Sequence, residues 1–397
     1  MAMIKNSFVL ADGEQFSEEQ NDVIHQSVAF ANHNLTQSQT RAFVIEGGAG
    51  AGKSVVLFEI FKQLQAAKSQ WRNFLLVNHA EMWKSYRELA SYQPGLKKNQ
   101  FLKPTTFINQ MTRHNQTADV VLIDEAHLLL TAPDRYNKFQ QENQLVEILK
   151  HARVVILVFD AHQVLKLKSM WHGDQLQTIL APFRPETVQL SEQYRMVGQS
   201  QSVVEWIDQL TQHKKIIDVA TTPSFDLRIY NDANRLYTAI CQENQRVGMS
   251  RILATTDYPY TVNRGKWYVT LDDFKLPWDQ LDTGVTPWAL RPETIDEVGS
   301  VYTIQGFDLN YAGVIIGPGI RYDNQKDQLI IDPSHYEDKA AFRSVGGKNL
   351  SLEDKQSIML NALNILLKRG RHGLFIAVAD PVLRQKLLAS VPKQSRY

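Results

Sequence analysis

Residues 47–54 read GGAGAGKS and match the pattern G-x-x-x-x-G-K-[ST] at every required position. An apolar run at 43–45 precedes them and a helical pattern at 55–64 follows, which is the context that this motif requires. Glycines let backbone N–H groups face a phosphate chain, Lys53 would reach the β- and γ-phosphates, and the Ser54 hydroxyl would hold Mg²⁺. We therefore predict a nucleotide-phosphate loop. Its predicted contact residues are Gly47, Gly48, Ala49, Gly50, Ala51, Gly52, Lys53, Ser54 and Val55.

Two carboxylates, Asp124 and Glu125, follow the apolar run 120–123. Carboxylates at the carboxyl end of a parallel strand lie where open α/β sheets bind their ligands, beside the phosphate loop. Asp124 would hold Mg²⁺ through water, and Glu125 would orient and deprotonate the attacking water. Alone, this pair could equally cap the next helix, so the prediction depends on the loop at 47–54.

A glutamine, Gln163, follows the next apolar run, 154–159, in the segment FDAHQ. An amide at this place can sense the γ-phosphate and signal its presence to a neighbouring domain. A polar loop without such a role is the alternative.

The elements that would position these residues alternate between short apolar runs and amphipathic helical stretches. The runs 43–45, 74–77, 120–123 and 154–159 lie in the first half, and 227–230, 251–254, 314–316 and 374–378 lie in the second. This pattern predicts an α/β fold with mostly parallel sheets covered on both faces. We expect one domain at 1–186 and another at 187–397, with a hinge at 182–185. A Trp- and Pro-bearing insertion around 260–295, centred on 267–292, is expected outside the core.

Composition limits the number of domains, the class of partner and the compartment, but it does not indicate a function. A chain of 397 residues exceeds one ordinary domain, and 43% hydrophobic with 21% charged residues is typical of a globular protein. The net charge of +1 leaves any polyanion site to a local patch. The single cysteine, Cys241, excludes an internal disulfide and fits a reducing compartment. Neither a signal peptide nor a bilayer-length apolar run is present, so we expect a cytoplasmic protein without membrane contact.

The order of these motifs resembles superfamily 1 helicases, and most closely the Schlafen group 3-like DNA/RNA helicase domain family. The resemblance extends from residue 16 to residue 380, and 298–317 is its most family-specific stretch. The stretches that carry it are LLVNHAEMWKSYR (75–87), TTFIN (105–109), VVLIDEAH (120–127), FDAHQVL (159–165), LSEQYR (190–195), VGSVYTIQGFDLNYAGVIIG (298–317) and NILLKRGRHGLFI (364–376).

This resemblance implies two RecA-like domains with ATP in the cleft between them, and Gln163 as the sensor of motif III. It implies that Arg195 and Arg369 reach the γ-phosphate across the cleft, with Arg371 as a nearby competitor. Gly306 would contact nucleotide in the motif V turn. Two positions depart from the family pattern: Lys368 stands where the family commonly has Thr, and Leu128 where it often has Arg.

Gln20 allows two interpretations. The segment FSEEQ at 16–20 resembles the Gln motif that precedes the phosphate loop, whose amide can contact adenine. Ser17 followed three residues later by Gln20 is also a capping box for the helix that follows.

The resemblance also suggests contacts to a nucleic-acid strand, which a motor would hold largely through its backbone. Trp83 and Tyr86 are three residues apart and share a helix face, so a position in the core is the alternative for that pair. The candidate contact residues are Asn78, His79, Trp83, Thr105, Thr106, Thr303 and Gln305.

These observations predict an Mg²⁺-dependent ATPase that moves along or remodels single-stranded or tailed DNA or RNA. An ATP-dependent switch that acts on a protein partner is the alternative. A small-molecule kinase fits less well, because it needs none of the stretches 190–195, 298–317 and 364–376. Asp332 with Glu337-Asp338-Lys339 imitates a nuclease metal motif, but no separate fold surrounds it, and we interpret it as chance.

Overall fold

The computed structural model describes residues 15–48, 50–67, 70–134, 138–160, 174–191, 201–220, 224–260, 265–279, 286–304, 306–342 and 350–397. Contacts along the backbone divide these residues into two compact units, one up to Ser191 and one from Gln201 onward. The predicted boundary at 186/187 and hinge at 182–185 are wrong by a few residues. The reason is that β6 (Glu186–Leu190), which follows this proline-containing stretch, is a strand of the first sheet.

The first unit is built on a six-stranded sheet with the order β3-β2-β4-β5-β1-β6, in which every strand pair is parallel. The strands are β1 (Arg41–Gly47), β2 (Asn73–Val77), β3 (Phe101–Leu102), β4 (Ala118–Asp124), β5 (Ala152–Phe159) and β6. The helices are α2 (Glu18–Asn34), α3 (Lys53–Ala67), α4 (Ala80–Tyr92), α5 (Pro104–His114), α6 (Gln144–Lys150) and α7 (Gln175–Leu180), with 3₁₀ turns η1 (Lys98–Gln100), η2 (Ala126–Leu128) and η5 (Ala181–Phe183).

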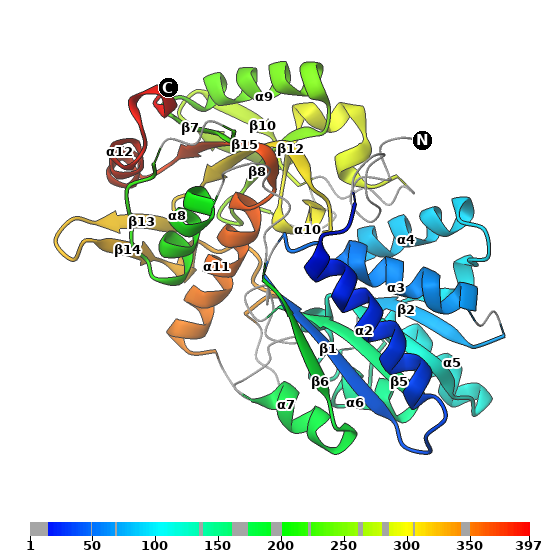
Figure 1. Ribbon diagram of the computed structural model, residues 1–397. Helices are drawn as coiled ribbons and strands as arrows, with labels where there is room; N and C mark the ends of the chain where they lie inside the picture. The colour runs from blue at the N-terminus through cyan, green and yellow to red at the C-terminus, as the bar shows by residue number, and fades with distance from the viewer. Residues whose placement is uncertain are drawn as a thin grey trace. The chain divides into compact units, whose positions relative to one another are not determined.

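Alternate residues of each strand enter two separate cores, which explains why the strands read as continuous apolar runs. In β1, Phe43 and Ile45 face the core that contains residues of α2, α3 and α4. Val44 faces the core that contains residues of α5, α6 and α7. Figure 1 shows α2, α3 and α4 together over one face of this sheet. The predicted strands of the first half are confirmed.

Strand order decides where the chemistry can lie. β5 pairs with β1 on one side and with β4 on the other. The carboxyl ends of these three neighbouring strands therefore meet at one edge, and they lead into the phosphate loop, the Asp124–Glu125 pair and Asp160.

The second unit contains a five-stranded parallel sheet with the order β11-β8-β12-β15-β7. Its strands are β7 (Asp226–Tyr230), β8 (Ser250–Ala254), β11 (Val298–Gly299), β12 (Leu309–Ile316) and β15 (Gly370–Val378). Its helices are α8 (Gln201–Gln212), α9 (Ala233–Val247), α10 (Val301–Ile304), α11 (Leu352–Leu367) and α12 (Pro381–Ser390), with 3₁₀ turns η6 (Trp288–Leu290), η7 (Pro292–Asp296), η8 (Pro333–His335) and η9 (Lys393–Ser395). Figure 1 shows α9 on one side of the sheet and α8 and α11 on the other. The predicted strands of the second half are confirmed.

Two antiparallel hairpins lie outside this sheet. One is formed by β9 (Tyr268–Leu271) and β10 (Phe274–Pro277), and the other by β13 (Ile320–Asp323) and β14 (Gln328–Ile331). The first hairpin falls within the predicted insertion, but the expectation that this segment lies outside the core is wrong. Val269, Phe274 and Trp278 are at most 1% exposed and belong to the same core as α9 and β12.

Among the residues that the structure describes, no helix is both long enough and apolar enough to span a bilayer.

Trp278 gives a test of this structural role. Trp278→Ala removes a ring that is 1% exposed, and cavities of this size typically cost about 3–5 kcal/mol. We expect a loss of that order in the free energy of unfolding, measured by urea titration. Leu352→Ala in the same unit is the control, because Leu352 is 64% exposed and should change stability by no more than about 0.5 kcal/mol. Equal effects of the two substitutions would contradict a core role for the hairpin segment.

Candidate active site

The phosphate loop follows β1 and ends at Lys53, the first residue of α3. Gly50 and Gly52 have φ angles of 90° and 75°, a conformation that side chains other than glycine rarely adopt. The Lys53 ammonium turns into the loop and donates to the carbonyl oxygens of Gly47 at 2.7 Å and Gly48 at 2.6 Å. The motif therefore forms the curled loop that the sequence predicts.

Lys53 also forms an ion pair with Asp160, with 3.1 Å between Nζ and Oδ2. Both side chains are more than 90% buried, and a buried charge is tolerated only when it is paired and hydrogen-bonded. Asp160 directly follows β5, the strand between the loop strand and the carboxylate strand. We did not predict this residue as part of the site, although a carboxylate at the end of an apolar run was a usable signal.

Asp124, the last residue of β4, is 1% exposed. Its Oδ1 accepts the backbone N–H of Glu125 at 2.9 Å, and its Oδ2 accepts the hydroxyl of Tyr86 at 2.6 Å. Burial, followed by the charge of Glu125, raises the pKa of Asp124 to about 6, while hydrogen bonds from the side chains of Tyr86 and Ser54 act in the opposite sense. The two predicted metal ligands, Ser54 and Asp124, therefore influence each other at the carboxyl edge of the sheet.

Glu125 has an unusual backbone, with φ and ψ both at 50° in the left-handed region. Such a conformation is uncommon for a residue other than glycine and often marks a functional site. Its Oε2 lies 3.0 Å from Nε2 of His127, which is fully buried. The contact is close but lacks hydrogen-bond geometry, so it places the His127 ring beside the predicted base without fixing the direction of its carboxylate. Glu125 and His127 are two residues apart in the same turn. The letters of the segment 124–127 alone did not predict that their side chains would meet.

Gln20 acts as the capping box that the sequence allows. Its Oε1 accepts the N–H of Ser17 at 3.1 Å, and its own N–H donates to the Ser17 hydroxyl at 3.2 Å. The same side chain lies against the phosphate loop, where Nε2 is 3.5 Å from the carbonyl oxygen of Ala51. A Cβ at Gly52 would come within 2.4 Å of that nitrogen, so this glycine is required by close approach as well as by its φ angle. The adenine contact stays a prediction.

Helix α4 contains the two aromatic residues considered for strand contact. Tyr86 is fully buried and belongs to the core, which contradicts that role for its ring. Trp83 is half-buried, and its indole N–H donates to the carbonyl of Phe101 at 3.0 Å. The guanidinium of Arg87 and the ammonium of Lys103 lie 4.7 and 5.6 Å from the centre of its rings.

The other candidate strand contacts have local partners or stand exposed. Asn78 donates to the carbonyl of Leu128 at 2.7 Å, and Thr105 accepts from Gln144 at 3.0 Å. His79 is the N-cap residue of α4, and Thr106 is exposed in the first turn of α5. The Thr303 hydroxyl donates to the Ser300 carbonyl at 3.0 Å and accepts the Ser300 N–H at 2.8 Å, within its own turn.

In the second unit, Arg369 lies between α11 and β15 and is 2% exposed. One terminal nitrogen of its guanidinium donates to the Phe307 carbonyl at 3.2 Å, directly after the turn at Gly306, whose φ is 84°. The neighbouring Lys368 pairs with Asp208 of α8 at 2.5 Å. The role of Arg369 as an arginine finger stays a prediction.

Four predicted site residues lie outside the described residues, namely Ala49, Gln163, Arg195 and Gln305. The acidic segment that imitates a nuclease motif has structural roles instead. Asp332 caps η8, Asp338 accepts the Tyr302 hydroxyl at 2.6 Å, and Lys339 donates to the Tyr336 carbonyl at 2.6 Å.

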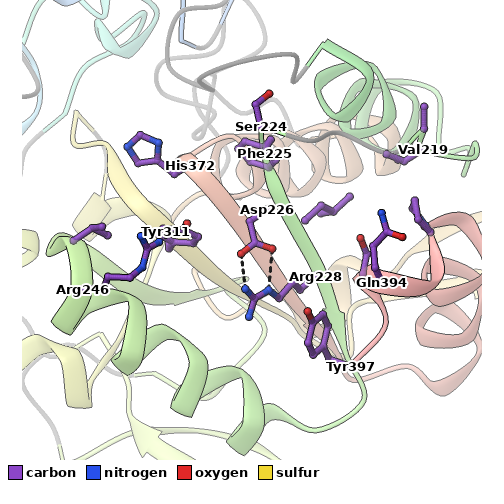
Figure 2. Close-up of a pocket in the computed structure, with 15 residues that line it drawn as sticks. Val219, Ser224, Phe225, Asp226, Arg228, Arg246, Tyr311, His372, Gln394 and Tyr397 are labelled. Atoms are coloured by element: carbon purple, nitrogen blue, oxygen red, sulfur yellow. Dashed lines mark hydrogen bonds and ion pairs between the residues drawn. The ribbon is translucent and has the colours of Figure 1, made fainter.

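A separate hollow of about 640 Å³ lies at the amino ends of β7, β12 and β15 (Figure 2). Asp226 and Arg228 form a two-bonded ion pair within it, at 2.6 and 2.8 Å. Arg246, also at its edge, pairs with Glu243. These arginines are thus compensated, and Thr303, Gly306 and Arg369 are not among its described lining residues.

The described residues fit a nucleotide with Mg²⁺. The glycine turns form a cradle that a side chain at Gly52 would fill, and Lys53 supplies a cation inside it. Hydroxyl and carboxylate oxygens, which Ser54 and Asp124 provide, are the ligands that Mg²⁺ prefers.

Asp124→Asn tests whether burial raises the pKa of the Asp124 carboxyl at the end of β4. Since the folded-state pKa of about 6 lies above that of an unfolded Asp, the native protein retains a proton that the unfolded chain loses between about pH 4 and 6. The aspartate therefore lowers the free energy of unfolding as pH rises through that window. Without nucleotide and in EDTA, we expect the variant to be more stable than wild type at pH 8, by up to about 3 kcal/mol, with the difference closing near pH 4.

The measurement is urea unfolding at several pH values, with Asp22→Asn, an exposed carboxylate of α2, as the control for net charge. Asp257 and Asp279, whose pKa values burial also raises to about 6, titrate in both proteins and cancel in the difference. A stability difference that does not change with pH would contradict the buried-carboxylate explanation.

Comparison with known proteins gives the family. The model of the Schlafen group 3, DNA/RNA helicase domain matches residues 40–380. The "Uncharacterized protein YPL245W" of Saccharomyces cerevisiae is 37% identical over 411 aligned residues, which cover 94% of this chain and 90% of that protein.

Solved structures give weaker similarities. Domain III of the Thermotoga maritima replication initiation protein DnaA is 14% identical, with a TM-score of 0.27, over 47% of this chain and 66% of that one. AMPPCP-bound DnaA from Aquifex aeolicus is 16% identical, with a TM-score of 0.27, over 53% and 54%. This chain thus spans between half and two thirds of the structures it matches. The family match covers most of the chain, and the protein belongs to the Schlafen group 3 DNA/RNA helicase domain family.

Proposed function

We propose that this protein is an Mg²⁺-dependent ATPase whose two units are RecA-like domains and which converts ATP hydrolysis into movement along, or remodelling of, nucleic acid. The observation that supports this most directly is the carboxyl edge of the first sheet. There the start of α3, with Lys53 and Ser54, and the end of β4, with Asp124 and Glu125, bring together the kinds of group that phosphoryl transfer to water uses.

In this proposal the phosphate loop and Lys53 would bind the β- and γ-phosphates, and Ser54 and Asp124 would hold Mg²⁺, which would supply positive charge against the phosphates. Glu125 accepts a proton from the attacking water, and the buried His127 ring lies 3.0 Å from its carboxylate. Lys53 has to exchange its two loop carbonyls for phosphate oxygens, while Asp160 can continue to compensate its charge from the other side.

Two substitutions separate binding from chemistry. Lys53→Ala should weaken ATP binding and abolish turnover, since it removes the cation that contacts the phosphates. Glu125→Gln should leave the dissociation constant for ATP within a few-fold of wild type and lower turnover by at least about 100-fold, the scale of general-base catalysis. Binding is measured with a fluorescent ATP analogue and turnover by phosphate release.

Lys62→Ala and Glu59→Gln, at two partly exposed positions of α3, are matched controls, because among the described residues their side chains bond to each other and to Gln63. Near-normal turnover in folded Glu125→Gln would remove Glu125 from the proposed chemistry.

The proposed strand contact is at Trp83. Single-stranded nucleic acid is usually held by cations together with aromatic rings on which bases stack. Here the half-buried indole of Trp83 lies beside the cations of Arg87 and Lys103. Lys103 is the N-cap residue of α5, whose first turn contains Thr105 and Thr106.

Single-stranded DNA or RNA should therefore stimulate the ATPase, and the stimulation should fall as salt rises, because phosphates supply much of the contact. Lys103→Ala should raise the strand concentration needed for half-maximal stimulation and leave the basal rate unchanged. Arg113→Ala, an exposed cation further along α5, is the matched control.

Strand displacement on a tailed duplex of about 20 base pairs extends this test, since opening such a length is costly. The described part of the 260–295 segment forms only a short hairpin and its flanking turns, so we expect weak or partner-dependent unwinding. An ATPase that no nucleic acid stimulates would instead favour the switch that acts on a protein partner.

A further inference from the structure

The Tyr86–Asp124 hydrogen bond joins two elements with different expected roles. Tyr86 lies on α4, which follows β2, and Asp124 ends β4, the neighbouring strand. The bond is 2.6 Å long, and both side chains are at most 1% exposed. Hydrogen bonds to a buried charged group are strong, because few other donors are available to it.

The carboxylate of Asp124 is held at both oxygens. Oδ1 accepts from the backbone of Glu125, which the turn after β4 fixes, and Oδ2 accepts from Tyr86. The orientation of the carboxylate therefore depends on where α4 places the tyrosine hydroxyl. Tyr86 is itself close to the other predicted metal ligand, because its oxygen lies 3.5 Å from the carbonyl oxygen of Ser54.

The ring of Tyr86 is packed from several directions. It stacks on Phe101 with ring centres 6.0 Å apart and an interplanar angle of 16°, and lies 5.8 Å from the ring of Phe58. Packing against α3 and β3 therefore fixes the place where the Tyr86 hydroxyl meets Asp124. Phenylalanine would fill the same space, so the hydroxyl can be removed without opening a cavity.

Helix α4 also carries Trp83 and Arg87, which we propose contact the nucleic-acid strand. Trp83 lies one turn before Tyr86, with Arg87 beside it, and both of these belong to the same helix. One helix thus carries both the proposed strand contact, at the half-buried Trp83, and a hydrogen bond to the predicted metal ligand, from the buried Tyr86.

We propose that Tyr86 is a positioning residue through which α4 couples strand binding to Mg²⁺ binding at Asp124. This inference rests on the proposed function. A strand that shifts α4 changes the orientation of the Asp124 carboxylate, and thus the affinity for Mg²⁺ with nucleotide. Because such coupling is reciprocal, Mg²⁺ with nucleotide must change the affinity for the strand by the same factor.

The first test uses nucleotide binding alone. Affinity for a fluorescent, non-hydrolysable ATP analogue is measured in EDTA and again across an Mg²⁺ titration. In wild type, Mg²⁺ should tighten binding, and in Tyr86→Phe this gain should shrink by about 5- to 150-fold, the usual range of coupling factors. Affinity in EDTA should be unchanged, because Lys53 and the loop are intact. Tyr92→Phe, at the exposed end of the same helix, is the matched control.

The second test measures affinity for a fluorescent single-stranded oligonucleotide, with the analogue present, in Mg²⁺ and in EDTA. Wild type and Tyr92→Phe should show a difference between the two conditions, and Tyr86→Phe should show little or none. A merely structural role for Tyr86 would lower both strand affinities together and reduce thermal stability.

The outcomes separate the two proposals. Absence of analogue binding by wild type would overturn the proposed function itself. Normal analogue binding with the same Mg²⁺ gain in Tyr86→Phe would overturn only the inference about Tyr86. A wild-type strand affinity that does not respond to Mg²⁺ would also overturn the coupling.

Discussion

Charges that have to be buried at the end of a parallel sheet determine how the first unit is arranged. Lys53 and Asp160 are both more than 90% buried, and either one without the other would leave an uncompensated charge in the interior. They meet because β5, which Asp160 follows, is the direct neighbour of β1, which leads into the loop. The two apolar cores on either side keep these strands in register, and so the polar groups appear together at the edge where the apolar runs end.

Local patterns were sufficient for much of the fold. Each predicted strand corresponds to a strand in the structure, because a buried parallel strand must be a continuous apolar run. The phosphate loop was predictable for a similar reason, since its glycines, lysine and serine are consecutive. The capping box at Ser17 and Gln20 is also local, and the structure shows that it coexists with a contact to the loop.

What could not be predicted depends on residues that are distant in the sequence. Tyr86 and Asp124 are 38 residues apart, and Lys53 and Asp160 are 107 apart, so no local pattern relates them. The position of β6 was misjudged because prolines suggested a hinge, whereas pairing with β1 decides the strand's place. The hairpin segment was misjudged because its sequence is irregular, although its aromatic residues fill the core beside α9.

Lys368 had stood out as a departure from the family pattern, and the structure gives it a role within the second unit. It pairs with Asp208, which also accepts from Asn364, and Asn364 donates in turn to Thr211. This polar network joins α11 to α8 immediately before Arg369. The lysine therefore anchors the backbone from which Arg369 extends, a task that a threonine side chain is too short to perform in this way.

The place of β6 has a practical consequence for anyone who wishes to study the first unit as an isolated fragment. A fragment that stops at residue 186 would lose β6, one of the two strands that pair with β1, and expose one edge of β1, whose residues are largely apolar. Unpaired edges of this kind recruit other chains, and aggregation during purification would be the result. Leu190 also lies so close to Gly47 that a Cβ there would come within 2.8 Å of its carbonyl oxygen, so the truncation would loosen the start of the phosphate loop as well. Fragment boundaries should therefore be placed beyond residue 191.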